Sequence, residues 1–394
     1  MMVPYNRNRK YRKADLFLLI LLGFSIIASS YQNLNMIGLY VFMPILILKV
    51  WYKKWKEIIN NKFVRYYLAL VIWIFLTCFT GIDVDYSLSH IVPIIATFLI
   101  STSMYQLALN EKNTKGLYYV YIAYYFSLLF YIYFWGELYI SDSTESERAG
   151  GVAMNANNFA YYLLYLTFGF HCLLYGRSNK LLVDSIVYLL LFALTLYVSL
   201  ITASRQILII QIPFITLLVL TRFVDKRANH LVPLFLFLLA LAYFVLPWFD
   251  NLYSDSLLAH RSEKAIEDDH RTWLIKRAIE VGKDNIIGGV GIGNFAKYAG
   301  GAFSHCSYTE LFACTGIMGT CLYIIMLVSF VKEQFKRYQK THDKLFVSFA
   351  FFGLLFIAAN LFYVYYDTIW LIGFFFIVVG HSQQYYRSFL NSYK

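Results

Sequence analysis

The chain has 394 residues, of which 59% are hydrophobic and 14% charged, and its mean hydropathy is +0.56. A water-soluble domain of this size would carry about 25% charged residues, so the composition excludes a soluble globular fold and predicts a polytopic membrane protein. The net charge of +11 does not indicate nucleic-acid binding, because most basic residues fall into one alternating set of short loops.

Apolar runs of membrane-spanning length occur along the whole chain. In chain order, the predicted spans are residues 14–30, 34–51, 66–80, 90–109, 116–135, 157–175, 181–201, 206–221, 230–248, 308–331, 345–362 and 367–382. The predicted fold is therefore all-α, a single transmembrane domain over residues 1–394 with about twelve helices. No A-x-A cleavage site follows the first run, so we expect an uncleaved span there rather than a signal peptide.

Lysine and arginine are distributed unevenly between alternate loops. If the N-terminus is cytoplasmic, the inner segments hold 25 of the 34 basic residues and the outer segments hold nine. Basic residues favour cytoplasmic loops, so the distribution predicts that both termini are cytoplasmic. It also leaves few outer basic residues, and these are the first candidates for function.

Two predicted outer loops are long, at residues 136–156 and 249–307. In the second, DDHRTWLIKRAIEVG predicts a helix near residues 269–282, ended by Gly282 and with one apolar face made of Leu274, Ala278 and Val281. The glycine-rich DNIIGGVGIGNF follows this helix. It lacks the strand–helix context of a dinucleotide fingerprint, so we expect its glycines to allow close backbone packing.

Arg205 lies in TASRQ, a predicted outer turn between two apolar spans, and Arg148 lies in ERAGG before the sixth span. An arginine near lipid is costly unless it is paired or hydrated. Arg205 is therefore either a fixed cation that faces a buried anion or a side chain that reaches the lipid headgroups. Arg148 either binds an anion or belongs to a mobile loop.

Arg271 lies in the first turn of the predicted loop helix, and Arg277 lies further along it. A helix start favours anions, and planar guanidinium groups suit phosphate oxygens. The other interpretation of Arg271 is an ion pair with the acidic residues just before it. That acidic run, EKAIEDDH, predicts solvated charge and a helix cap rather than a metal site.

His305 lies in SHCSYTELFACTGIMG, directly before a predicted membrane helix. A histidine with an ordinary pKa of about 6.5 suits general-base catalysis at neutral pH, although a single histidine is as readily structural. Glu310 follows within the next turns and is expected to orient nearby groups. The chain has no GxSxG, HExxH or P-loop motif, and we predict no metal and no cofactor.

Four segments occur in an order that identifies a family resemblance. They are RAGGVAMNANNFAYYL, LITASRQILII, RTWLIKRAIEVGKDNIIGGVGIGNF and SHCSYTELFACTGIMG. They resemble the Asn-Asn helix start, the Ser-Arg turn, the loop helix with its glycine turn, and the histidine motif of the O-antigen polymerase/ligase family. The match covers about residues 148–330. The family commonly has asparagine after this histidine, whereas this chain has Cys306.

The resemblance implies a bacterial membrane glycosyltransferase whose active site lies on the extracytoplasmic face of the cytoplasmic (inner) membrane. The donor would be a glycan on undecaprenyl diphosphate, and the product would form with inversion and without a metal. The resemblance implies three catalytic residues, His305, Arg205 and Arg271. It also implies a set of substrate-binding residues, namely Arg148, Arg277, Tyr308, Glu310 and Asn155.

The leading hypothesis is a polymerase of lipid-linked repeat units for O-antigen, capsule or exopolysaccharide. Within the same family, an O-antigen ligase would transfer the glycan to lipid A-core instead. A transporter or flippase of lipid-linked oligosaccharide is the alternative from another class. The predicted partners are the lipid-linked oligosaccharide, membrane lipid, a chain-length regulator and a flippase, with no nucleic acid.

Overall fold

A computed structural model describes residues 17–23, 40–41, 43–135, 138–140, 147–149, 156–175, 181–223, 238, 241–253, 256, 258 and 270–392 of the protein. The described chain is helical except for one small antiparallel sheet, in which β1 (Leu138–Ile140) pairs with β2 (Glu147–Ala149). The predicted all-α class is therefore correct at the level of the whole fold.

The helices follow one another along the chain with short connections between most of them. In order they are α3 (Met43–Ile59), α4 (Lys62–Cys78), α5 (Val84–Ala108), α6 (Glu111–Trp135), α7 (Ala156–Tyr175), α8 (Leu181–Thr202), α9 (Arg205–Phe223), η4 (Leu241–Val245), α11 (Leu246–Tyr253), α13 (His270–Asp284), η6 (Asn294–Tyr298), α14 (Ser307–Thr341), α15 (Lys344–Ala359) and α16 (Ile369–Asn391).

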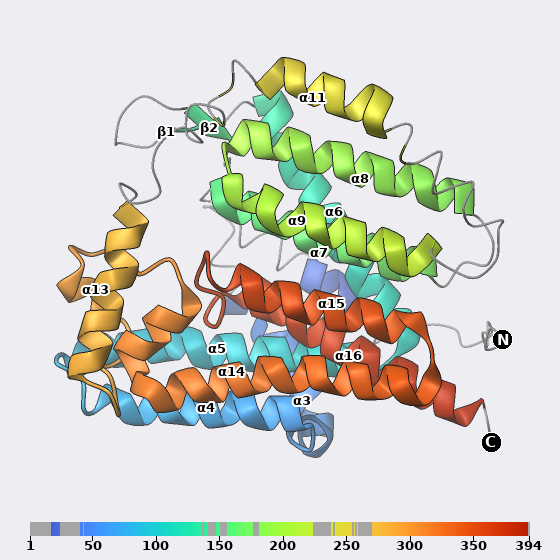
Figure 1. Ribbon diagram of the computed structural model, residues 1–394. Coiled ribbons are helices and arrows are strands. Elements are labelled where there is room, and N and C mark those ends of the chain that lie inside the picture. Colours follow the sequence, from blue (N-terminus) through green and yellow to red (C-terminus); the bar gives the residue numbers. More distant parts are fainter. Residues whose placement is uncertain are drawn as a thin grey trace.

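The long helices lie side by side and run between two ends of a bundle (Figure 1). Helix α13 crosses one end, which we call the α13 end, and the C-terminal end of α16 lies at the opposite end. Helix α16 packs against α5, and α14 packs between α4 and α15, while α9 packs against α8 and α15. Consecutive helices alternate in direction, so the start of α14 and the start of α9 both lie at the α13 end.

Five of the described helices are long and apolar enough to cross a membrane: α5, α6, α8, α9 and α14. Helices α3, α7 and α15 contain shorter apolar stretches. Two helices continue past the predicted span ends at residues 331 and 382: α14 continues to Thr341 and α16 to Asn391. The prediction ended each span at its last apolar stretch, whereas the helices continue through polar residues such as Arg337, whose Nη1 donates to Ser382 Oγ across the two helices.

Several polar groups inside the bundle are paired with one another across helices. His171 of α7 contacts the hydroxyl of Tyr188 at 2.6 Å and that of Ser348 at 2.8 Å, which joins α7 to α8 and α15. Arg222 and Asp184 form a buried ion pair of 2.5 Å between α9 and α8 at the end opposite α13. Such pairing is needed because an apolar surround offers no water to a polar group.

Helix α13 buries the apolar face expected from its sequence, with Leu274, Ala278 and Val281 packed against the protein. The helix expected near residues 269–282 is present as His270–Asp284, so it continues two residues past Gly282. The glycine serves packing instead. A Cβ atom at Gly282 would lie 2.3 Å from the ring of Phe312 on α14, so only glycine lets the two helices approach this closely.

Helix α14 is broken at Gly316, whose backbone has φ 67° and ψ −166°. This conformation is essentially restricted to glycine, and it frees backbone groups on both sides of the break. The turn after α13 takes up three of them, through bonds of Val290 N to Ala313 O, Gly291 N to Cys314 O, and Ile317 N to Ile286 O of 2.8 to 2.9 Å.

The fourth freed group at this break is the carbonyl of Thr315, which accepts a bond of 2.9 Å from Trp73 Nε1 of α4. The glycine-rich turn thus packs against α14 as the sequence led us to expect. A Cβ atom at Gly289 would lie 2.3 Å from the backbone of Cys314. These bonds join α13, the turn that follows it and α14 into one unit. The loop that carries His305 lies directly before α14 in this unit.

Candidate active site

The turn between α8 and α9 holds Arg205 at the first position of a helix. Ala203 in this turn has a positive φ of 46°, and both it and Ser204 are buried. A left-handed alanine costs roughly 1–3 kcal/mol and persists only where the surrounding structure holds it. The half-buried Arg205 follows directly at the first position of α9, where the helix dipole is positive.

Tyr161 of α7 is the point at which several elements of the α13 end meet. Its hydroxyl donates to Gln206 Oε1 at 2.6 Å, next to Arg205, and lies 3.3 Å from the carbonyl oxygen of Phe362. The positive charge of Arg271 on α13 also acts on this phenol. Residues from α7, α9, α13 and the α15–α16 loop are therefore brought together at one phenolic side chain.

A row of aromatic rings connects Tyr161 with His305. The ring of Tyr161 lies 5.9 Å from that of Tyr363, which lies 6.0 Å from the ring of Phe303. The ring of Phe303 in turn lies 4.2 Å from the imidazole of His305. We define Tyr161, Tyr363 and Phe303 as one aromatic cluster. His305 contacts it, Gln206 directly after Arg205 is bonded to it, and Arg271 lies within electrostatic range of it.

His305 itself has a left-handed backbone, with φ 58°. Strain of this kind clusters at functional sites, because it is kept only where it serves a purpose. The strained loop is fixed by Glu310, whose Oε2 accepts a bond of 2.6 Å from Ser304 N. Glu310 is only 6% exposed. Its carboxylate therefore holds the backbone directly before the histidine.

A second set of bonds fixes the start of α14 to the loop that carries Tyr363. Ser307 N donates to Asn360 O at 2.9 Å, and Ser307 Oγ donates to Tyr363 O at the same distance. Tyr365 N donates back to Ser307 Oγ at 2.9 Å. These bonds fix His305 and Tyr363 relative to one another. Cys306 is buried and lies at the N-cap of α14 without a side-chain capping bond.

The substrate-binding residues inferred from the resemblance are more scattered. Tyr308 donates its hydroxyl to Ile357 O at 2.8 Å, so it packs between α14 and α15. Arg277 pairs with Glu280 at 3.0 Å and lies over the ring of Tyr298. The backbone of Arg148 pairs with Tyr139 in the small sheet.

Asn155 and the acidic residues before His270 lie outside the described residues. Within the part of the chain that the structure describes, no three His, Cys, Asp or Glu side chains are placed to hold one metal ion. The roles of Arg148, Arg277, Tyr308 and Asn155 stay predictions.

Sequence reasoning missed Tyr161, Gln206, Tyr363 and Asp367. Gln206 is a polar residue beside Arg205 at the start of an apolar helix. That position is the one feature of the sequence from which Gln206 could have been predicted. The tyrosines are indistinguishable in the sequence from the many other aromatic residues. Asp367 lies in the α15–α16 loop, where burial raises the pKa of its carboxyl from 3.8 to about 6.

Comparison with known protein families and with curated proteins finds no match to this chain. The site is therefore defined by its own geometry. It consists of an aromatic cluster that contacts His305 on its strained loop and is bonded to Gln206 at the start of α9, directly after Arg205.

Proposed function

We propose that the protein is a polymerase of lipid-linked polysaccharide repeat units that transfers glycan from undecaprenyl diphosphate to a sugar hydroxyl of another lipid-linked unit. One observation supports the proposal. The cluster of Tyr161, Tyr363 and Phe303 contacts His305, is hydrogen-bonded to Gln206 directly after Arg205, and lies within electrostatic range of Arg271. Cations, a base and aromatic rings are the groups that a diphosphate-linked sugar requires.

The chemistry follows from the bond that breaks, between the anomeric carbon of the donor sugar and a diphosphate oxygen. The bonding electrons leave with undecaprenyl diphosphate, so negative charge grows on that oxygen. Arg205 and Arg271 stabilise this charge. His305 accepts the proton of the attacking hydroxyl, whose oxygen forms the new glycosidic bond from the opposite face and inverts the anomeric centre.

The exposed aromatic rings of the α13 end suit the sugar part of the substrate. Trp273 is 49% exposed and stacks on His270 at 5.4 Å, while Phe303 borders His305. A sugar ring presents apolar C–H groups that pack on aromatic faces. We assign the glycan to this surface and the diphosphate to the arginines beneath it.

For the membrane arrangement we propose twelve spans in the bacterial inner membrane, with both termini in the cytoplasm and the α13 end outside. The distribution of charge supports this orientation. Basic residues gather at the end opposite α13, where Lys62 and Arg337 both pair with Glu333 and Arg222 pairs with Asp184. The candidate site would then open to the extracytoplasmic space, where lipid-linked repeat units are joined.

The broken helix α14 bears on the alternative of a transporter. Transporters use broken helices to present free backbone groups to ions and substrates. Here the groups freed at Gly316 are bonded to the turn after α13 and to Trp73. The break therefore serves packing, which favours a fixed catalytic site over a passage.

The test uses purified protein in detergent with an undecaprenyl-diphosphate-linked repeat unit as the only substrate. We expect a ladder of longer glycans and release of undecaprenyl diphosphate in equal amounts, and we expect both to persist in the presence of a chelator. A second reaction adds lipid A-core. Transfer to lipid A-core without self-lengthening would assign the ligase reaction. If neither product forms, transport is the remaining hypothesis.

A further inference from the structure

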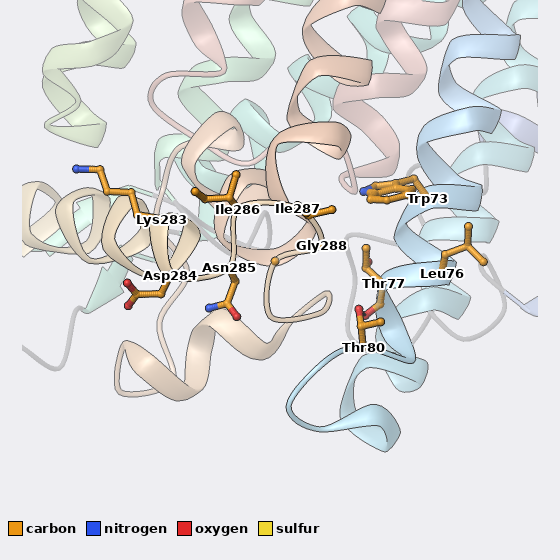
Figure 2. A pocket seen from close by; sticks show the side chains of 11 residues that line it. Trp73, Leu76, Thr77, Thr80, Lys283, Asp284, Asn285, Ile286, Ile287 and Gly288 are labelled. Carbon is orange, nitrogen blue, oxygen red and sulfur yellow. Dashed lines mark hydrogen bonds between the residues drawn. The ribbon is translucent and has the colours of Figure 1, made fainter.

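A groove lies between α4 and the turn after α13 (Figure 2). Its cavity volume is about 610 Å³. One wall is α4 with Trp73, Leu76 and Thr77, and the other is the turn with Ile286 and Ile287. Figure 2 shows Ile287 directed toward Trp73 across the groove, while Thr80 and Asn285 lie at its polar end.

The walls of this groove are fixed before any ligand arrives. Trp73 is held by its bond to Thr315 O, and the turn is held by the bonds of Ile286, Val290 and Gly291 to the broken helix. Gly288 leaves space within the groove, because a Cβ atom there would meet only Thr80 Oγ1, at 3.5 Å. A preformed apolar groove binds a flexible chain without the cost of ordering itself.

The mouth of the groove is apolar and continuous with an exposed apolar face of α4. Ile287 is 73% exposed and Ile286 is 53% exposed. Ile72 and Leu76 on α4 and Phe79 at its C-cap are all exposed, and their spacing places them on one helix face. Exposed isoleucines beside an exposed apolar helix face gain from contact with hydrocarbon, so a lipid chain can enter the groove from this side.

We propose that this groove binds the isoprenoid chain of the acceptor, the second lipid-linked repeat unit, and this inference rests on the proposed polymerase function. The position of the groove selects the acceptor over the donor. Arg271 begins α13, whereas the groove lies at the other end of that helix, beside Asp284. The helix separates them by about 20 Å at 1.5 Å per residue.

The two substrates differ in how far their reacting atoms lie from their lipids. The donor's anomeric carbon is bonded directly to the diphosphate, so the donor lipid must reach the arginines. The acceptor reacts through the sugar farthest from its lipid, so its lipid must be held several sugars away from His305. A groove at the far end of α13 provides that separation, and the acceptor glycan would extend along α13 toward the site.

The experiment uses a photoreactive polyisoprenyl phosphate with the full-length protein in nanodiscs of phosphatidylethanolamine and phosphatidylglycerol. Mass spectrometry maps the labelled peptides that contain Trp73 or Ile287. Gly288→Phe fills the groove and should lower this labelling about tenfold, the loss expected when about two methylene groups lose their contacts. The matched variant Gly288→Ala adds only a Cβ atom and should label like the wild type.

A second variant, Ile287→Ser, changes a side chain that is already mostly exposed, so it keeps the fold and should also lower labelling. Labelling that is unchanged in both Gly288→Phe and Ile287→Ser would overturn the inference. Equal labelling of the same peptides by a photoreactive phospholipid would also overturn it, because the surface would then be ordinary lipid contact.

The labelling does not depend on transfer, so failure of the inference differs from failure of the proposed function. If the protein lengthens glycan but Gly288→Phe changes neither the labelling nor the KM for acceptor, the polymerase function stands. The proposed role of the groove is then contradicted. If labelling depends on Gly288 but no polymer forms, the groove is still a polyisoprenyl site. That result would contradict both the acceptor role and the polymerase function. A raised KM for acceptor in Gly288→Phe, with the donor's KM unchanged, supports the full inference.

Discussion

Replacing Glu310 tests whether the strained loop before α14 positions His305. Glu310→Ala removes the acceptor for Ser304 N, a charge-assisted bond of 2.6 Å between two buried groups. Leaving a buried donor without its partner costs roughly 1–3 kcal/mol. The left-handed backbone of His305 costs a similar amount to maintain. Without the carboxylate, the loop should therefore relax and withdraw the imidazole from the acceptor.

A loss of about 2 kcal/mol in the positioned conformation corresponds to roughly 30-fold fewer active molecules. We expect kcat for glycan transfer to fall by about that factor while the KM for donor stays near the wild-type value. The assay is chain lengthening by purified protein at matched concentration. Glu310→Gln keeps an oxygen acceptor without the charge, so it should recover part of the rate.

Glu333→Gln is the matched control, because Glu333 lies in the same helix at the opposite end and pairs with Lys62 and Arg337. This variant is expected to transfer glycan normally. If Glu310→Ala turns over like the wild type, the carboxylate does not position the histidine. If only the KM for donor rises, Glu310 contacts the substrate itself and the account of the loop is wrong.

Three further predictions concern the base, the broken helix and the α15–α16 loop. His305→Ala should abolish transfer and leave equilibrium binding of the donor intact; normal turnover would exclude the imidazole as the base. Gly316→Ala places a Cβ atom 2.2 Å from Ile287 O and should lower the stability in detergent by at least about 3 kcal/mol, whereas Gly288→Ala should change it little. Burial favours the protonated form of Asp367, so its contribution to stability is full below pH 3.8 and lost as pH rises through about 6. The thermal stability of Asp367→Asn relative to the wild type should therefore increase over that range, and parallel curves would contradict it.

The parts of the fold that depend on local pattern could be read from the sequence. The apolar face of α13 recurs at helical spacing, and its residues are buried as expected. The turn at Arg205 follows from one cation between two apolar runs. The glycine-rich turn requires close backbone approach, and Gly289 and Gly291 pack against neighbouring backbone at distances that no side chain would allow.

The parts that depend on contacts between distant segments could not be read in this way. ACTGIMG reads as continuous apolar helix, because nothing local shows that Val290 and Gly291 will bond to carbonyls freed at Gly316. In the sequence, Gly282 indicates a helix end. The contact that requires glycine there is made by the ring of Phe312 on another helix, which the local sequence does not show. Local sequence specifies which positions need glycine more reliably than it specifies why.

The same limit applies to the candidate site. Charge and rarity identify Arg205, Arg271 and His305, since an outer cation or histidine stands out against an apolar background. The aromatic cluster that joins them consists of residue types that make up a fifth of the chain. Tyr161 and Tyr363 are set apart only by their hydrogen bonds and ring contacts across α7, α9 and the α15–α16 loop.

The most direct test of the central claim is the rate at which Arg205→Lys lengthens an undecaprenyl-diphosphate-linked repeat unit. Lysine keeps the positive charge but loses the planar fork that contacts two phosphate oxygens. We expect chain growth and release of undecaprenyl diphosphate to fall together by about 100-fold. Arg222→Lys, which changes an ion pair at the opposite end of the bundle, should keep the wild-type rate. Wild-type chain growth by Arg205→Lys would contradict the account.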